Sequence, residues 1–259
     1  MKIEESVLHI TKWLQEYSED SKTNGFVVGI SGGIDSAVTS TLCALTNKKL
    51  LCVLMPIHQH KTEFDRSKEH VEWLKAKFNN VSICEINLTS TFDTLAAQIP
   101  EDIKGDLTMA NTRARLRMTT LYTYAGAKGM LVAGTGNKVE DFGVGFFTKH
   151  GDGGVDISPI ADLMKTEVYK VAAYLGIVNS IQEASPTDGL WADGRNDEEQ
   201  LGATYKELEW AMMTYQVSTI NSFEGRKQVV FDIFSRLHKA NLHKMKAIPV
   251  CSIPRNLKG

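Results

Sequence analysis

One apolar segment that runs directly into a glycine turn constrains this sequence more than any other feature. Residues 25–30 (GFVVGI) have the length and composition of a strand buried on both faces. Residues 31–36 (SGGIDS) follow at once, and residues 37–45 (AVTSTLCAL) continue with the composition of a helix. A strand that passes through a tight turn into a helix begins a β-α-β unit, and this pattern predicts a parallel sheet covered by helices.

Strands and helices alternate along the first 160 residues. Three more strands are predicted at residues 49–55, 81–86 and 129–133. We therefore expect an α/β fold, a doubly wound parallel sheet of about five strands flanked by helices, in the order 3-2-1-4-5. A single domain should span residues 1–259, with an α/β core at about 20–160 and a mainly helical portion at about 161–259.

Composition argues against several classes of function. The 31 acidic and 29 basic side chains give a formal net charge of −2, which lacks the basic footprint of a nucleic-acid-binding protein. No apolar run approaches the ~18 residues of a membrane span, and residues 1–10 carry no signal-type apolar segment. The four cysteines form no C-x-x-C pair, which favours free thiols over metal ligands. We expect no nucleic-acid partner, no membrane association and a cytoplasmic location.

The turn at residues 31–36 has the chemistry of a phosphate site. Its two glycines lack the Cβ atoms that would hold a phosphate away from the backbone, and the following helix presents its first N–H groups to the anion. Ser31 and Ser36 can add hydroxyl donors, and Asp35 offers a hard oxygen ligand for Mg²⁺. The segment is not a Walker A motif, because G-x-x-x-x-G-K-[ST] is absent. The alternative is a tight Gly-Gly turn that only connects a strand to a helix.

The complete SGGIDS segment resembles the S-G-G-x-D-S signature of the ATP pyrophosphatase family. Members of that family bind pyrophosphate and cleave ATP between the α and β phosphates. The resemblance implies an adenine nucleotide alpha hydrolase-like fold, with ATP as co-substrate and Mg²⁺ as cofactor. It leaves the acceptor of the reaction open.

Segments further along the chain resemble ammonia-dependent NAD synthetases. The matching stretches are NTRARLRM (111–118), AGTGNKVED (133–141), GFFTKHGDGGVDISPIADLMKTEV (145–168), SPTDGLW (185–191) and DEEQLGATYKELE (197–209). GFFTK-x-GDGG-x-D is the most discriminating of these, because no general requirement of the fold explains it. The resemblance implies a ligase that amidates deamido-NAD with ammonia and forms NAD, AMP and pyrophosphate through an acyl adenylate, the last step of NAD biosynthesis.

This resemblance also implies roles for individual residues. The ATP-binding residues would be Gly29, Ile30, Ser31, Gly32, Gly33, Ile34, Asp35, Ser36, Thr135, Lys165 and Thr187. The deamido-NAD-binding residues would be Arg115, Lys149, Asp156, His243 and Lys244. The catalytic residues would be Asp35, Lys165 and Asp156. The resemblance further implies a homodimer with the dinucleotide site between the subunits, and Tyr122 and Tyr124 are candidates for that interface.

The resemblance implies that Glu140 shares Mg²⁺ with Asp35, and the predicted strand order supports this pairing. Strands 1 and 4 are neighbours in the predicted order, so the turns that follow them meet at one edge of the sheet. One turn carries Asp35 and the other, at residues 134–140, carries Glu140. The segment 136–144 is one residue longer than in many relatives, but Glu140 keeps its spacing from Thr135.

Two other functions stay open at this stage. An enzyme similar to GMP or asparagine synthetase would keep the adenylation step and change the acceptor. A regulatory module of the universal-stress or flavoprotein type would bind ATP without releasing pyrophosphate. Glutamine-fed synthetases need an amidohydrolase domain for which 259 residues leave no room, so we expect free ammonia as the nitrogen donor. The turn-rich residues 183–200 are expected to form a mobile loop.

Overall fold

The structure is a computed structural model, and it describes residues 1–186, 196–217 and 223–258. Within these residues, four parallel strands form the sheet: β1 (Gly25–Gly29), β2 (Lys49–Leu54), β3 (Val81–Glu85) and β4 (Leu131–Val132). Their order is β3-β2-β1-β4, which confirms the parallel α/β fold and the predicted order of the first four strands.

The predicted fifth strand is reduced to one residue pair. Ala133 and Ile157 form a single parallel bridge beside β4, and no further strand is paired there in the described part of the chain. Pro159 follows two residues after the bridge. Because proline has no backbone N–H to donate, it cannot extend a hydrogen-bonded ladder.

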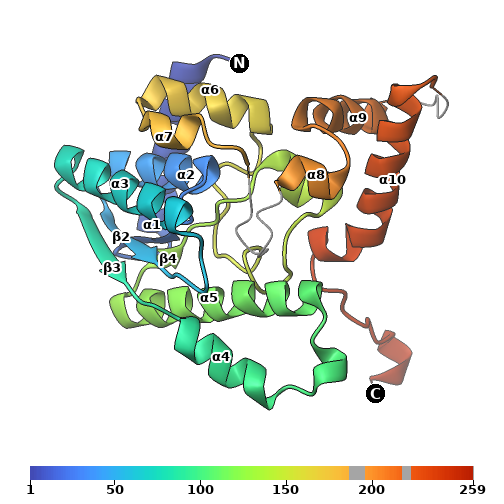
Figure 1. The fold of residues 1–259 in the computed structure, drawn as a ribbon, viewed down its shortest axis with the longest axis horizontal. Coiled ribbons are helices and arrows are strands. Elements are labelled where there is room, and N and C mark those ends of the chain that lie inside the picture. The colour runs from blue at the N-terminus through green and yellow to red at the C-terminus, as the bar shows by residue number, and fades with distance from the viewer. Residues whose placement is uncertain (187–195, 218–222, 259) are drawn as a thin grey trace.

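Helices cover both faces of the sheet (Figure 1). One face carries α1 (Ile3–Asp20), α2 (Ile34–Leu45), α3 (Lys61–Lys77), α6 (Lys165–Leu175) and α7 (Asn179–Gln182). The other face carries α4 (Thr89–Gln98) and α5 (Asp106–Lys128). Side chains alternate along β1 to serve both layers, since Phe26 and Val28 pack in the first core cluster and Val27 in the second.

The C-terminal helices build a third cluster beside the sheet. The helices are α8 (Asp197–Leu201), α9 (Tyr205–Val217) and α10 (Arg226–Met245). They pack against the π-helix η2 (Val139–Val144), which leaves the carboxyl end of β4. Short 3₁₀ helices lie at η1 (Glu101–Ile103) and η3 (Arg255–Leu257). None of the helices in the described ranges combines the length and hydrophobicity needed to cross a membrane.

Two leucines of α1 test how this packing stabilises the fold. Leu14 is 0% exposed in the first core cluster, whereas Leu8 on the same helix is 63% exposed. Leu14→Ala should lower the free energy of unfolding by about 2–5 kcal/mol, because it leaves a cavity. Leu8→Ala should change it by less than about 0.5 kcal/mol. Urea denaturation measures both, and equal losses would contradict the assigned orientation of α1.

Candidate active site

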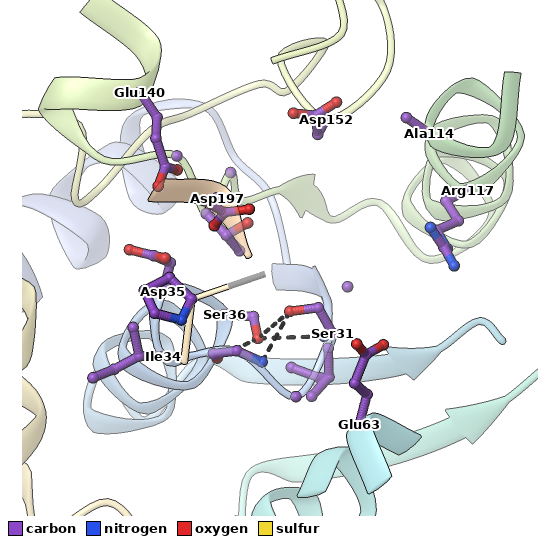
Figure 2. Close-up of a pocket in the computed structure, with 18 of the residues that line it drawn as sticks. Ser31, Ile34, Asp35, Ser36, Glu63, Ala114, Arg117, Glu140, Asp152 and Asp197 are labelled. Atoms are coloured by element: carbon purple, nitrogen blue, oxygen red, sulfur yellow. Dashed lines mark hydrogen bonds between the residues drawn. The ribbon is translucent and has the colours of Figure 1, made fainter. Parts of the chain in front are cut away.

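A deep cavity lies at the carboxyl edge of the sheet, where β1 and β4 end side by side (Figure 2). All of the predicted ATP-binding residues that the structure describes line this cavity. Thr187 lies outside the described residues, as does part of the predicted mobile loop. Ligands of open α/β sheets bind at this kind of edge, where connections leave neighbouring strands toward different sides.

The glycine turn is held in shape by its own serines. The hydroxyls of Ser31 and Ser36 share a hydrogen bond of 3.1 Å, and the backbone N–H of Gly33 donates to Ser31 Oγ at 3.1 Å. Figure 2 draws the bonds between the two serines as dashed lines. Helix α2 begins at Ile34 directly after Gly33, which has no side chain to cap the helix. The first N–H groups of α2 are therefore directed to an anion rather than to a capping side chain.

Gly32 is required by the backbone of this turn. Its φ of +87° lies in the left-handed region, and a Cβ built there would stand 2.4 Å from the carbonyl oxygen of Glu63. Any larger residue would push the turn away from α3. The turn can therefore approach a phosphate closely only with glycine at this position.

A buried lysine joins the turn to the neighbouring strand exit. Lys165, the first residue of α6, is 3% exposed. Its ammonium lies 2.5 Å from Asp35 Oδ2 and 3.0 Å from Glu140 Oε1. The structure thus brings together three residues that are 25 or more positions apart in sequence, as the predicted strand order requires.

The electrostatics of this group depend on burial and on mutual pairing. Burial raises the pKa of the Asp35 carboxyl, and the charge of Lys165 only partly opposes that rise. Burial also acts to raise the pKa of Glu140, but Lys165 and a hydrogen bond from Tyr205 outweigh it, so this pKa is lowered. Burial disfavours the Lys165 ammonium, yet the two carboxylates together hold its pKa above the ordinary value. The lysine is therefore a permanent cation.

Asn137 and Tyr205 complete the group, although neither is among the predicted site residues. The fully buried Asn137 donates from Nδ2 to Asp35 Oδ1 at 3.3 Å and accepts the backbone N–H groups of Val139 and Glu140 at 3.2 Å. The Tyr205 hydroxyl donates to Glu140 Oε1 at 2.5 Å. Asn137 lies in the matched AGTGNKVED stretch, which is the signal that could have identified it.

The cavity carries further carboxyl groups. Asp141, Asp152 and Asp197 also line it. Burial, followed by the charges of Glu140, Asp152 and Asp35, raises the pKa of Asp141 well above its ordinary value. No cluster of three or more His, Cys, Asp or Glu side chains within the described ranges is arranged to hold a metal by itself. Mg²⁺ in nucleotide sites commonly takes one or two carboxylates together with phosphate oxygens and waters, and Asp35 and Glu140 fit that kind of site.

The segment 136–144, predicted to be one residue longer than in many relatives, contains the π-helix η2. The i→i+5 hydrogen bonding of a π-helix takes more residues per turn than an α-helix, and such turns are frequent at functional sites. Glu140 lies in the first turn of η2 and still reaches Lys165. The extra residue therefore does not remove Glu140 from the cavity.

Four of the five predicted substrate-binding residues form a group of contacts beside the middle of α5. Arg115 Nε donates to the carbonyl of Lys149 at 3.3 Å, and Lys149 Nζ donates to the carbonyl of His243 at 2.9 Å. Lys244 Nζ donates to the carbonyl of Phe147 at 2.7 Å. The structure thus joins α5, the loop after η2 and the end of α10.

Asp156 is not part of either group. Its carboxylate accepts from the Tyr122 hydroxyl at 3.0 Å and from the backbone N–H of Val132 at 2.8 Å, and it does not line the cavity. Burial, followed by the hydrogen bond to Asp156, raises the pKa of Tyr122 to about 12. Tyr122 is exposed, whereas Tyr124 packs against the second core cluster and its hydroxyl accepts from Cys84 Sγ.

The comparisons with known proteins identify the family. The family model described as NAD synthase matches residues 6–247. This chain belongs to the NAD synthase family. The NH(3)-dependent NAD(+) synthetase of Carboxydothermus hydrogenoformans is 37% identical over 250 residues, which cover 95% of this chain and 96% of that protein. The one from Methanocaldococcus jannaschii is 40% identical over 220 residues, covering 83% and 82%.

Solved structures agree with this NAD synthase assignment. The NMN synthetase from Francisella tularensis has a TM-score of 0.84 at 28% identity, covering 98% of this chain and 99% of that chain. The NH3-dependent NAD synthetase from Campylobacter jejuni, in complex with the nitrate ion, has a TM-score of 0.79 at 25% identity, covering 97% and 100%. The predicted family and fold class are confirmed, and membership decides against the GMP- or asparagine-synthetase-like enzyme and the regulatory module.

The buried lysine provides a test of the site. Lys165→Met removes the cation between two carboxylates and should lower the free energy of unfolding by about 3–5 kcal/mol at neutral pH. Lys138→Met is the matched control, because Lys138 pairs with Asp162 at 2.7 Å on the surface, with side chains 30% and 95% exposed. Loss of that pair should cost about 1 kcal/mol or less. Urea denaturation compares the two variants, and similar losses would contradict a buried charge group.

Gly32 provides a second test. Gly32→Ala should destabilise the fold by at least about 1–2 kcal/mol, the cost of a left-handed conformation, and should weaken ATP binding as the turn shifts. Gly126→Ala in α5 is the control, because a Cβ there meets nothing within 4 Å and alanine favours a helix. Titration calorimetry with ATP and urea denaturation give the two readouts. Unchanged ATP affinity in Gly32→Ala would place the nucleotide elsewhere.

Proposed function

We propose that this chain is an ammonia-dependent NAD synthetase that uses ATP to amidate deamido-NAD, giving NAD, AMP and pyrophosphate. The observation that carries the proposal is the contact between Asp35, at the glycine turn, and the Lys165–Glu140 pair. It brings phosphate-binding N–H groups, a permanent cation and two carboxylates to one cavity. Homologous ammonia-dependent NAD synthetases over most of the chain length support the same assignment.

The chemistry explains why ATP is needed. A nicotinate carboxylate does not react with ammonia, because its leaving group would be oxide. In the first step a carboxylate oxygen attacks the α-phosphorus of ATP, the bond to the β-phosphate oxygen breaks, and pyrophosphate leaves. In the second step ammonia attacks the acyl carbon of the adenylate and AMP leaves with the former carboxylate oxygen. The proton lost by the attacking nitrogen passes to solvent or to a cavity carboxylate.

The chain's own residues supply positioning and charge for these steps. The N–H groups at the start of α2 and the hydroxyls of Ser31 and Ser36 hold the pyrophosphate portion. Lys165 adds a positive charge beside the phosphate oxygens as negative charge develops on the leaving group. Asp35 and Glu140 would hold Mg²⁺, whose chemistry here is neutralisation of the phosphate charge.

The acceptor would lie where the middle of α5 approaches the end of α10. Arg115 and the His243-Lys244 pair provide cationic and hydrogen-bonding groups there, with Lys149 connecting them. We extend the proposal to a homodimer in the cytoplasm. Arg115 and His243 are exposed in the single chain, and so is the α5 face that carries Tyr122, which leaves this side open to a second subunit.

Asp156 keeps a smaller proposed role. Both of its carboxylate oxygens already accept hydrogen bonds, from Tyr122 and from Val132. An acceptor-binding role that works through Tyr122 fits this geometry better than proton transfer at the reacting carbon.

A second candidate is the amidation of nicotinate mononucleotide. The similarity to an NMN synthetase at a TM-score of 0.84 favours it. The two acceptors carry the same pyridine carboxylate and differ by the adenylate half of the dinucleotide. The cavity chemistry around Asp35 would be identical in both cases, so only the acceptor end distinguishes them.

A single assay tests the reaction and the acceptor. Protein with ATP, Mg²⁺ and ammonium should release AMP and pyrophosphate in equal amounts, with a higher kcat/KM for deamido-NAD than for nicotinate mononucleotide. The reverse preference would support the second candidate. Release of ADP and phosphate would refute the proposed bond cleavage.

Asp35→Asn should lower kcat by about 100-fold or more, because it removes one of the two paired carboxylates. Asp162→Asn serves as the control, since Asp162 lies on the surface with a 95% exposed side chain. This control should keep wild-type turnover in the same assay. An Asp35→Asn variant with normal turnover would remove Asp35 from the reaction.

A further inference from the structure

Helix α9 directs two buried polar side chains at the start of α6. Tyr205 is 3% exposed and Glu209 is 8% exposed. The two residues are four positions apart, so they lie one turn from each other on the same face of α9. Both contact the segment that carries Lys165.

Glu209 supplies an acceptor at the start of α6, where Glu167 of the same helix accepts only the backbone N–H of Met164, at 3.0 Å. Helix α6 begins at Lys165, and the residue at its N-cap position is Met164, whose thioether is a weak acceptor. The first N–H groups of a helix need acceptors from outside the helix. Glu209 Oε1 accepts the backbone N–H of Thr166 at 2.8 Å, and Oε2 accepts the Thr166 hydroxyl at 2.7 Å. The carboxylate is also placed where the helix dipole favours a negative charge.

Tyr205 contacts the side-chain ammonium of Lys165. The Lys165 ammonium lies 4.7 Å from the centroid of the Tyr205 ring, within the range of a cation–π contact. The hydroxyl of that ring donates to Glu140, which itself pairs with Lys165. One face of α9 therefore contacts the backbone at the start of α6 and the charged end of the Lys165 side chain.

We propose that Glu209 is a positioning residue for Lys165, acting together with Tyr205 from one face of α9. The inference rests on the proposed function, in which Lys165 stands beside the phosphates of ATP. If the first turn of α6 moves, the ammonium moves with it, and a displacement of about 1 Å can cost about 100-fold in rate. The alternative is that Glu209 only stabilises α6, in which case its loss would lower stability and leave turnover intact.

Glu209→Gln tests the proposal with little change in shape. The amide nitrogen that replaces one carboxylate oxygen can only donate, so the variant loses the bond accepted from the Thr166 hydroxyl and the negative charge at the start of α6. We expect kcat for AMP release to fall by about 10- to 100-fold. The KM for deamido-NAD should stay near the wild-type value, because the acceptor residues lie on α5 and α10. A rise of about 10- to 100-fold in KM with an unchanged kcat would overturn the proposal.

Glu207→Gln is the matched control on the same helix. Glu207 Oε2 accepts the backbone N–H of Thr204 at 2.8 Å, and the carboxylate pairs with Arg226 at 2.8 Å, away from Lys165. This variant should lose thermal stability and keep the wild-type kcat, measured at a temperature where thermal melts show both variants folded. If the two variants lose turnover equally, Glu209 has no special relation to Lys165.

Substitutions at Thr166 test whether the effect passes through this contact. Thr166→Ser keeps the hydroxyl and should keep the wild-type kcat, whereas Thr166→Val should lose part of it. The Glu209→Gln, Thr166→Val double variant should be little slower than Glu209→Gln alone, because the two changes remove the same interaction. Additive losses would refute the pathway through Thr166.

The proposed function and the positioning role of Glu209 are refuted by different results. A wild-type protein that releases no pyrophosphate would refute the proposed function. An active wild type with a fully active Glu209→Gln variant would refute the positioning role alone.

Discussion

The Lys165 ammonium between the carboxylates of Asp35 and Glu140 is the interaction on which the site depends. Each charge has lost most of its water, and only the presence of the others offsets that cost. Such a group adds little net stability to the fold. It does restrict where its three side chains can lie, because a misplaced partner leaves a buried charge unpaired. It therefore fixes the relative positions of α2, η2 and α6 around the cavity.

The parallel sheet makes this meeting possible. Because β1 and β4 are neighbours and run in the same direction, the turns that follow them leave from one edge. Asp35 comes from the first turn and Glu140 from the second, which bends as a π-helix. Lys165 comes from the start of α6, which follows the Ala133–Ile157 bridge and packs against α2. The pairing of Asp35 and Glu140 around Lys165 is thus a consequence of strand order.

The C-terminal helices are more than a cover for the sheet. Their hydrophobic cluster packs on η2, Tyr205 of α9 contacts Lys165 and Glu140, and Glu209 of α9 contacts Thr166. The end of α10 contacts the loop that carries Lys149. The same layer of helices therefore contacts both the proposed nucleotide end and the proposed acceptor end of the site. These contacts can hold the two ends at a fixed distance from each other.

The sequence by itself determined the alternation of strands and helices, the phosphate chemistry of residues 31–36 and the proximity of Asp35 to Glu140. These follow from local composition and from the general geometry of parallel sheets. Only the tertiary structure decided that Asn137, Tyr205 and Glu209 reach the same group, that Asp156 faces Tyr122, and that the fifth strand stops at a single bridge. The reason is that hydrophobic periodicity indicates which face of a helix is buried, whereas the partner of a polar side chain on that face depends on how distant segments pack.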